Sequence, residues 1–285
     1  MSVNAIGIDV SERGLIAVVI DAQGTIVRGA TSHDTADLAK VVRAVSSKGP
    51  SPVVGVAAEP SHRPLIEGSL GKLNPRISSP GSAAVVAETW IGAAKGARHA
   101  ICLWIGDRVF AGLLLDGQPW AGAHGFAGSA GWLALNPVER QDYRRFGGFA
   151  AEVSHSGIAR RLSWRIQSGD HSEVLERAGG LDAITAAHVF EGARSGDGLA
   201  LSVVRDTAKY IGMAIANLAS AVDPECVVLG GDLAAAGDLV FEPMAQECSR
   251  WLPPSILPVL RIELSTLGAN GVAIGAARQA AVQAG

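Results

Sequence analysis

The stretch AIGIDVSERGLIAVVIDAQGTIV, residues 5–27, predicts how this chain begins to fold. Residues 5–10 and 15–20 are two short runs rich in Ile and Val, and a tight charged turn separates them. A second turn at 22–24 leads into another short run at 25–28. Apolar runs of this length between turn residues are typical of strands joined by hairpins. We therefore expect three antiparallel strands at the start of the chain.

The same arrangement recurs in the middle of the sequence. AICLWI (100–105) and VFAGLLL (109–115) flank a charged turn, and an Asp-Gly turn follows them at 116–117. Two similar hairpin starts predict two related α/β domains that face each other across a central cleft.

Helices are expected between and after these strand clusters. Over 34–47, Leu38, Val41, Val42 and Val45 fall on one face at helical spacing, and 53–57 is a buried strand. The alanine-rich segment 83–97 predicts a further helix. The remaining expected elements are helices at 183–194 and 198–222, a strand running into a Gly-Gly turn and a helix within CVVLGGDLAAAG (226–237), and a terminal helix after LGANG (267–271).

Composition restricts the class of protein. The 285 residues are 48% hydrophobic and 18% charged, with a formal net charge of −3, which is typical of a soluble globular protein and gives no electrostatic reason to expect nucleic acid or a membrane as partner. Cys102, Cys226 and Cys248 form no Cys-x-x-Cys pair, so reduced core thiols are expected. With no leader or spanning segment in the sequence, we expect a cytoplasmic protein.

Several segments, in order along the chain, resemble the ROK family of bacterial sugar kinases and sugar-responsive repressors. They are residues 7–27, 83–96, 110–132, 185–201, 215–239 and 267–277. The resemblance implies an α/β protein of two actin-like ATPase (RNase H-like) domains, the first at 1–98 plus 267–285 and the second at 99–266. It also implies a homodimer and Mg-ATP as cofactor.

The two phosphate-binding loops depart from the family pattern. The family's first hairpin reads Asp-x-Gly-Gly-Thr, whereas this chain keeps Asp9 and then has Ser11, Glu12 and Arg13. A carboxylate within about 4 Å of one phosphate charge is unfavourable by about 4 kcal/mol at an effective dielectric near 20. The second loop, Gly-Thr-Gly-x-Gly in the family, becomes GDRVF at 106–110. Arg13 and Arg108 are either solvated turn charges or a re-purposed anion site.

The nucleotide-binding positions that the resemblance assigns are Asp9, Arg13, Gly106, Gly230 and Gly231. In the Gly230-Gly231 turn, backbone without side chains can lie against adenine or ribose. Such a turn also has a structural use, because it packs a strand closely against a helix.

The family's catalytic base is the aspartate of an Asn-Asp-x-Asn motif before the alanine-rich helix, and here Ser79-Pro80-Gly81-Ser82 occupies those positions. Proline cannot accept a proton, and loss of a general base lowers the rate by about 10² to 10⁴. Asp9 and Asp107 remain as the candidates for a catalytic carboxylate.

The sugar and zinc motifs are also replaced. Gly-Glu-x-Gly-His becomes GSAGW at 128–132, so Ser129 and Trp132 take the two ligand positions. Trp132 either stacks on a sugar or lies half-buried in the core, and nearby His124 is a loop residue or a ligand. YRRFGGFAAE (143–152) replaces the cysteine-rich zinc signature and contains no thiolate, which predicts no zinc. Glu152 matches an acidic residue of the family after that signature.

Three functions follow from these observations. The first is a ROK-like protein without phosphotransfer activity that binds a sugar-like small ligand or acts in regulation. The second is an ATP-dependent sugar kinase acting on a hexose or N-acetylhexosamine, which rests on fold-level analogy. The third, a DNA-binding repressor, is disfavoured because only four residues precede AIGIDV and no basic surface is predicted.

Overall fold

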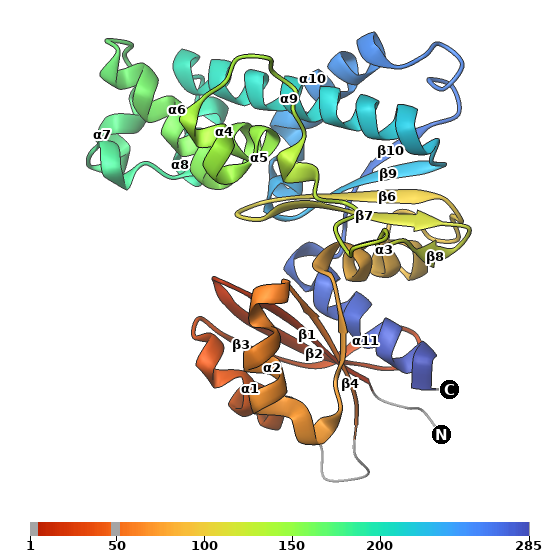
Figure 1. Ribbon diagram of the computed structural model, residues 1–285. Helices are drawn as coiled ribbons and strands as arrows, with labels where there is room; N and C mark the ends of the chain where they lie inside the picture. Colours follow the sequence, from red (N-terminus) through yellow and green to blue (C-terminus); the bar gives the residue numbers. More distant parts are fainter. Residues whose placement is uncertain (1–4, 47–51, 285) are drawn as a thin grey trace. The chain divides into compact units, whose positions relative to one another are not determined.

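Figure 1 shows the chain as a computed structural model, which describes residues 5–46 and 52–284. The strands form two five-stranded sheets. The strands are β1 (Ala5–Ser11), β2 (Gly14–Ile20), β3 (Ile26–Ser32), β4 (Val53–Ala58), β5 (Arg76–Ser78), β6 (Ala100–Ile105), β7 (Val109–Leu115), β8 (Gln118–Pro119), β9 (Cys226–Gly230) and β10 (Arg261–Leu264).

The helices lie between the strands and after them, and six follow one another between β8 and β9. They are α1 (Leu38–Val45), α2 (Arg63–Leu70), α3 (Pro80–Trp90), α4 (Gln141–Phe146), α5 (Gly148–Val153), α6 (His155–Gln167), α7 (Val174–Ala178), α8 (Ala186–Arg194), α9 (Gly198–Val222), α10 (Gly237–Trp251) and α11 (Gly271–Ala284). Seven 3-10 segments lie among them in the described part of the chain: Thr35–Asp37, Pro60–His62, Gly71–Leu73, Ala130–Trp132, Leu181–Ala183, Asp232–Ala236 and Gly268–Asn270.

The two sheets share one topology. The first has the order β3-β2-β1-β4-β5, and the second, read from its other edge, has the order β8-β7-β6-β9-β10. In the first sheet β1 is antiparallel to β2 and parallel to β4, and in the second β7 is antiparallel to β8 while β9 is parallel to β10. The repetition predicted from the two hairpin starts is therefore confirmed, and the protein is of mixed α/β class with the actin-like ATPase fold.

The chain divides into two compact units. The first contains residues 1–102, 111–128 and 265–285, and the second contains 103–110 and 129–264. The sequence-based boundaries at 98/99 and 266/267 stay a prediction.

In the first unit the central strand β1 separates two apolar layers. Ile6, Ile8 and Val10 lie in one buried cluster with the predicted face of α1, and on the opposite face Ala5 packs in a cluster with α11. Alternation along a strand puts Gly7 and Asp9 on that second face. A Cβ atom on Gly7 would lie 1.9 Å from the carbonyl oxygen of Ala273, so only glycine lets α11 approach this closely.

The second unit is organised around α9, against which α5, α6, α8 and α10 pack (Figure 1). Close contact between α9 and α10 depends on Gly212, where a Cβ atom would meet the Met244 carbonyl oxygen at 2.6 Å. The helix α9 spans the predicted range and ends at Asp223, which adopts a left-handed conformation.

Three predicted helices need correction at their ends. The alanine-rich helix 83–97 is wrong in both bounds: Ser79 caps α3, which therefore starts at Pro80, and the helix ends at Trp90. Beyond its end the Glu88 carboxylate accepts a hydrogen bond from the Ala93 N–H at 3.0 Å, which replaces the continuing helix. The helix predicted from 183 begins at Ala186 because Thr185 caps it.

The third correction concerns the first predicted helix, which starts at Leu38 after a 3-10 turn at Thr35–Asp37 that Asp34 caps. Its predicted last residue, 47, lies outside the described residues. Leu38, Val41, Val42 and Val45 are all buried, as the spacing predicts.

The three cysteines are buried, as expected of core residues, and their reduced state stays a prediction. Burial raises the pKa of Cys248 to about 11. Across residues 5–46 and 52–284 no helix combines the length and apolar character needed to cross a membrane.

Candidate functional site

The first hairpin places a buried carboxylate behind an exposed charged turn. Asp9 on β1 is 4% exposed, whereas Glu12 and Arg13 form the two-residue tip and are exposed. Ser11 pairs with Gly14 across the turn, and the Ser11 hydroxyl donates to the Gly14 carbonyl at 3.2 Å. Gly14 has a φ of +125°, and a Cβ atom there would lie 2.0 Å from the Ser32 carbonyl oxygen. The hairpin is a closed two-residue turn with its charges in solvent.

The start of α3 contains the positions to which the sequence resemblance assigns the family's general base. Pro80 and Gly81 form the buried first turn of this helix, and the Ser79 hydroxyl accepts a hydrogen bond from the Ser82 N–H. A Cβ atom on Gly81 would lie 2.3 Å from the Ala111 carbonyl oxygen of β7. This segment is a capped and closely packed helix start with no carboxylate, so it offers nothing that could take a proton from an alcohol.

The second hairpin is part of a cluster of three titratable side chains. Asp107 in the turn and Asp232 after β9 both lie close to His155, the first residue of α6: His155 Nδ1 is 3.5 Å from an oxygen of Asp107 and 3.9 Å from one of Asp232. One ligand atom from each residue lies within 4.8 Å of the others. The His155 N–H donates to the Gly106 carbonyl at 3.1 Å, which fixes α6 to the turn.

Two glycine turns build this cluster. Gly231 has a φ of +84°, and a Cβ atom there would lie 2.4 Å from the Ile105 carbonyl oxygen. A Cβ atom on Gly106 would lie 3.2 Å from the Asp232 carboxylate. Gly106, Asp107 and Gly231, all predicted from the sequence, therefore lie together, and the structure adds His155 and Asp232 to them.

Both carboxylates affect what this turn can bind. Two unit charges 4.8 Å apart repel by about 3 kcal/mol at an effective dielectric near 20, and by less where solvent reaches one of them. The Asp232 side chain is 52% exposed and that of Asp107 is 24% exposed. The cluster consequently favours a cation over a phosphate.

Arg108 in the same turn lies over an aromatic ring. Its guanidinium carbon is 5.4 Å from the centroid of Phe110, which in turn stacks on Trp104 at 5.8 Å between ring centroids. A cation–π contact of this kind stabilises the arginine along the surface of β7. The alternative of an anion site formed by Arg13 and Arg108 stays a prediction.

The loop that replaces the sugar motif is exposed. His124 and Ser129 lie in solvent within the irregular segment after β8, as the loop prediction for His124 expects. Trp132 is 62% exposed, so its interpretation as a half-buried core residue is wrong. The adjacent Gly131 is buried, and a Cβ atom on Gly147 would lie 2.3 Å from its carbonyl oxygen. An exposed indole remains available for stacking on a ligand.

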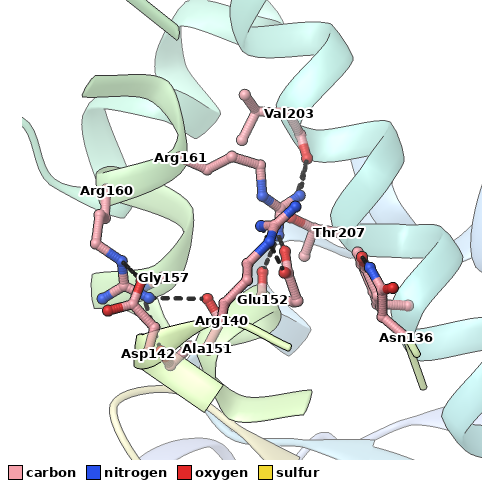
Figure 2. A network of polar contacts seen from close by, with 12 residues as sticks. Asn136, Arg140, Asp142, Ala151, Glu152, Gly157, Arg160, Arg161, Val203 and Thr207 are labelled. Carbon is pink, nitrogen blue, oxygen red and sulfur yellow. Dashed lines mark hydrogen bonds and ion pairs between the residues drawn. The ribbon is translucent and has the colours of Figure 1, made fainter. Parts of the chain in front are cut away.

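Glu152 is buried in a polar network that Figure 2 shows. Its side chain is 5% exposed, and its two oxygens lie 2.7 Å from Arg161 and 3.3 Å from Arg140. The Tyr143 hydroxyl donates a short hydrogen bond to the same carboxylate, and burial together with this acceptor raises the pKa of Tyr143. Arg161 also donates to the carbonyl oxygens of Glu152 and Val203. This network of α4, α5, α6 and α9 stands where the family carries its zinc signature.

An open pocket of about 630 Å³ lies beside this network within the second unit. Each cation in its wall has an acidic neighbour: Arg165 pairs with Asp170 at 2.6 Å and Lys209 with Asp206 at 3.3 Å. Arg161 stacks on Tyr210 at 5.7 Å. The pocket wall is therefore a set of internal ion pairs.

Asp9, Arg13 and His124 belong to the first unit, and the other residues proposed from the sequence belong to the second. Sequence reasoning missed His155, Asp232, Arg140 and Arg161. Asp232 directly follows the Gly230-Gly231 turn and Arg161 lies nine residues after Glu152. His155 lies far from both of its aspartates in the sequence, so no spacing pattern identifies that group.

The two sheets of equal strand order are those of the actin-like ATPase fold. Family comparison supports the same class, because residues 74–282 match the ROK family. The chain belongs to the ROK family.

Its relatives include both enzymes and regulators. The chain is 31% identical over 206 residues to a glucokinase of Halalkalibacterium halodurans, a match covering 72% of this chain and 62% of the relative. It is 26% identical over 191 residues to the DNA-binding transcriptional dual regulator NagC of Escherichia coli, covering 65% of this chain and 46% of the relative. The chain thus spans less than two thirds of the length of these relatives.

Among solved structures, the chain is similar to a ROK family glucokinase from Streptomyces griseus in complex with glucose and AMPPNP. The TM-score is 0.82 at 24% identity, and the match covers 98% of this chain and 99% of that one. This likeness supports the fold.

Proposed function

We propose that this protein is a sugar kinase-like member of the ROK family that binds a sugar-like small ligand, or regulates through such binding, without transferring phosphate. The observation that carries the proposal is Pro80. At the position where the family has its general base, the chain has a buried proline in the first turn of α3. Without a base, the rate of proton transfer from an alcohol falls by about 10² to 10⁴.

Two further features support the proposal. The second phosphate loop carries Asp107 beside Asp232, which disfavours a phosphate at that turn. Glu152, the acidic position next to the lost zinc signature, is fully occupied by Arg140, Arg161 and Tyr143. The missing base and the altered phosphate loop affect different parts of phosphotransfer, so their effects on rate combine.

The ligand class follows from Trp132. An indole that is 62% exposed in the loop of the family's sugar motif offers an apolar ring for the face of a pyranose or a similar small molecule. We further propose that the protein forms a homodimer and binds neither nucleic acid nor a membrane.

The test is calorimetric titration of the purified protein with glucose, N-acetylglucosamine and ADP, together with ADP release from Mg-ATP. We expect heat of binding from a sugar and no sugar-dependent ADP release above the protein-free blank. Trp132→Ala should abolish the sugar heat. Trp251→Ala is the matched control, because Trp251 on α10 is 60% exposed. ADP release at a rate comparable with that of an active ROK glucokinase contradicts the proposal, and so does binding that both variants retain.

A working ATP-dependent sugar kinase is the second candidate. It is favoured by the 31% identity to a glucokinase and by the retained Gly230-Gly231 turn. In that case Asp9 or Asp107 would have to replace the missing base. Sugar-dependent ADP release that Asp107→Asn or Asp9→Asn abolishes would establish it.

A further inference from the structure

We propose that Asp107, His155 and Asp232 form a binding site for a divalent transition-metal ion of the zinc type. The three residues belong to the turn between β6 and β7, the start of α6 and the segment after β9. All three lie in the second unit, so the site is built within one compact part of the chain.

The distances approach the edges of a coordination polyhedron. Two ligand atoms at about 2.0–2.2 Å from a tetrahedral ion are about 3.3–3.6 Å apart. The His155 nitrogen lies 3.5 Å from the Asp107 oxygen, within this range, and 3.9 Å from the Asp232 oxygen, beyond it. The three ligand atoms lie within 4.8 Å of one another. An ion between them therefore requires the carboxylates to move closer, and the Asp232 side chain, which is 52% exposed, has room to do so.

The backbone around the cluster makes room for both carboxylates. A Cβ atom on Gly106 would approach the Asp232 carboxylate to 3.2 Å, so the glycine keeps the space between the turn and that side chain open. The backbone N–H of His155 donates a hydrogen bond to the Gly106 carbonyl at 3.1 Å, and this bond holds the start of α6 beside the turn. The positions of two of the three ligands are thus fixed by backbone contacts.

The donor set selects the kind of ion. Imidazole nitrogen favours zinc, nickel, copper or iron over magnesium and calcium, and two carboxylates are compatible with zinc. Three protein ligands leave at least one coordination position for water, as in open zinc sites. Bound in this way, the ion also neutralises the repulsion between the two aspartates.

This site differs from the zinc signature whose loss the sequence predicts. That signature needs thiolates, and residues 143–152 contain none. The sequence analysis expected no metal ligand in this chain. The proposed site uses oxygen and nitrogen ligands from three separate segments, which explains why no motif indicated it.

The test is equilibrium dialysis of tag-free, EDTA-treated full-length protein against Zn²⁺, followed by elemental analysis, with Mg²⁺ in a parallel series. We expect one zinc ion per chain and no comparable magnesium binding. Asp107→Asn, His155→Gln and Asp232→Asn should each weaken zinc binding by at least about 10-fold, since loss of even a supporting contact to a metal ligand has an effect of that size.

The matched control is His99→Gln. His99 also lies near an aspartate, 3.6 Å from Asp116, but that pair has a single carboxylate and is more exposed. It should leave the zinc affinity unchanged.

Asp232→Asn also tests whether a loss of zinc binding results from misfolding. The Asp232 side chain is 52% exposed, so the circular dichroism melt of this variant should match that of the parent. The visible spectrum of the Co²⁺-loaded protein gives a second readout and should change in His155→Gln. No zinc uptake by the parent, or uptake that the three variants retain and His99→Gln removes, would overturn the site in favour of an ion pair of protonated His155 with its aspartates.

Discussion

The buried network of Glu152 allows a quantitative prediction. Arg161→Met removes the ion pair at 2.7 Å between two side chains that are 15% and 5% exposed. Breaking one partner of a buried pair typically lowers the free energy of unfolding by about 3–5 kcal/mol, because a charge is left buried. Arg140 still faces the carboxylate at 3.3 Å, although it is 46% exposed. We therefore expect the lower end, about 3 kcal/mol.

Hydrogen exchange measured by mass spectrometry is the suitable assay, since two compact units need not unfold in a single transition. At about 1.4 kcal/mol for each factor of ten, a loss of about 3 kcal/mol accelerates exchange about 100-fold. The acceleration should appear in peptides of α6 and α9, which Arg161 and Val203 connect (Figure 2).

Arg194→Met is the control for this prediction. Arg194 pairs with Asp238 at 2.7 Å in the same unit, but the two side chains are 43% and 54% exposed. Exposed pairs contribute about 0–1 kcal/mol, so exchange should rise by less than about 5-fold. The reasoning would be refuted if both variants had equal effects, or if Arg161→Met remained below 5-fold.

Three other changes test the fold and the site. Burial raises the pKa of Glu88 above its ordinary 4.5, so the parent loses stability as the pH rises from 4.5 through that raised pKa. Glu88→Gln should therefore gain thermal stability relative to the parent as the pH rises above 4.5, and parallel pH profiles would contradict this. Gly7→Val should prevent soluble expression or lower the melting temperature sharply, since even its Cβ would lie 1.9 Å from a carbonyl oxygen, whereas Gly68→Ala, which meets no atom within 4 Å, should not. Trp132→Ala should leave the melting temperature within about 2 °C of the parent because the ring is mostly exposed, and a larger loss would mean that the ring packs.

Much of the fold is readable in the sequence because the pattern of apolar residues there is strong. The apolar runs at 5–10 and 15–20 form two almost fully buried strands, as predicted, and α9 spans the predicted range. The end of α3 was not predictable from propensity. Alanine favours continuing the helix, but the Glu88 side chain turns back to cap the Ala93 N–H, and this depends on burial.

The candidate site was predictable only in part, for a physical reason. Gly106, Asp107 and Gly231 stand in turns whose residue types indicate them directly. His155 and Asp232 can be recognised as candidate ligands only in the folded protein, where the strand order β9-β6-β7 brings their segments together. Of the two alternatives for Trp132, the half-buried one was wrong, because residue type alone does not show whether an indole in a loop is covered, and this ring is 62% exposed.

The central claim is that a sugar kinase fold has lost phosphotransfer through the change at Pro80. The most direct measurement is a stoichiometric reaction: protein, glucose and Mg-ATP at equal concentrations, sampled over hours and analysed for sugar phosphate by mass spectrometry, with N-acetylglucosamine in parallel. Loss of the base alone lowers the rate by about 10² to 10⁴, so our account predicts conversion at least about 100-fold slower than that of an active ROK glucokinase sampled in parallel. Conversion of either sugar at the rate of that glucokinase, as expected of a kinase turning over at about 1–100 per second, would contradict it.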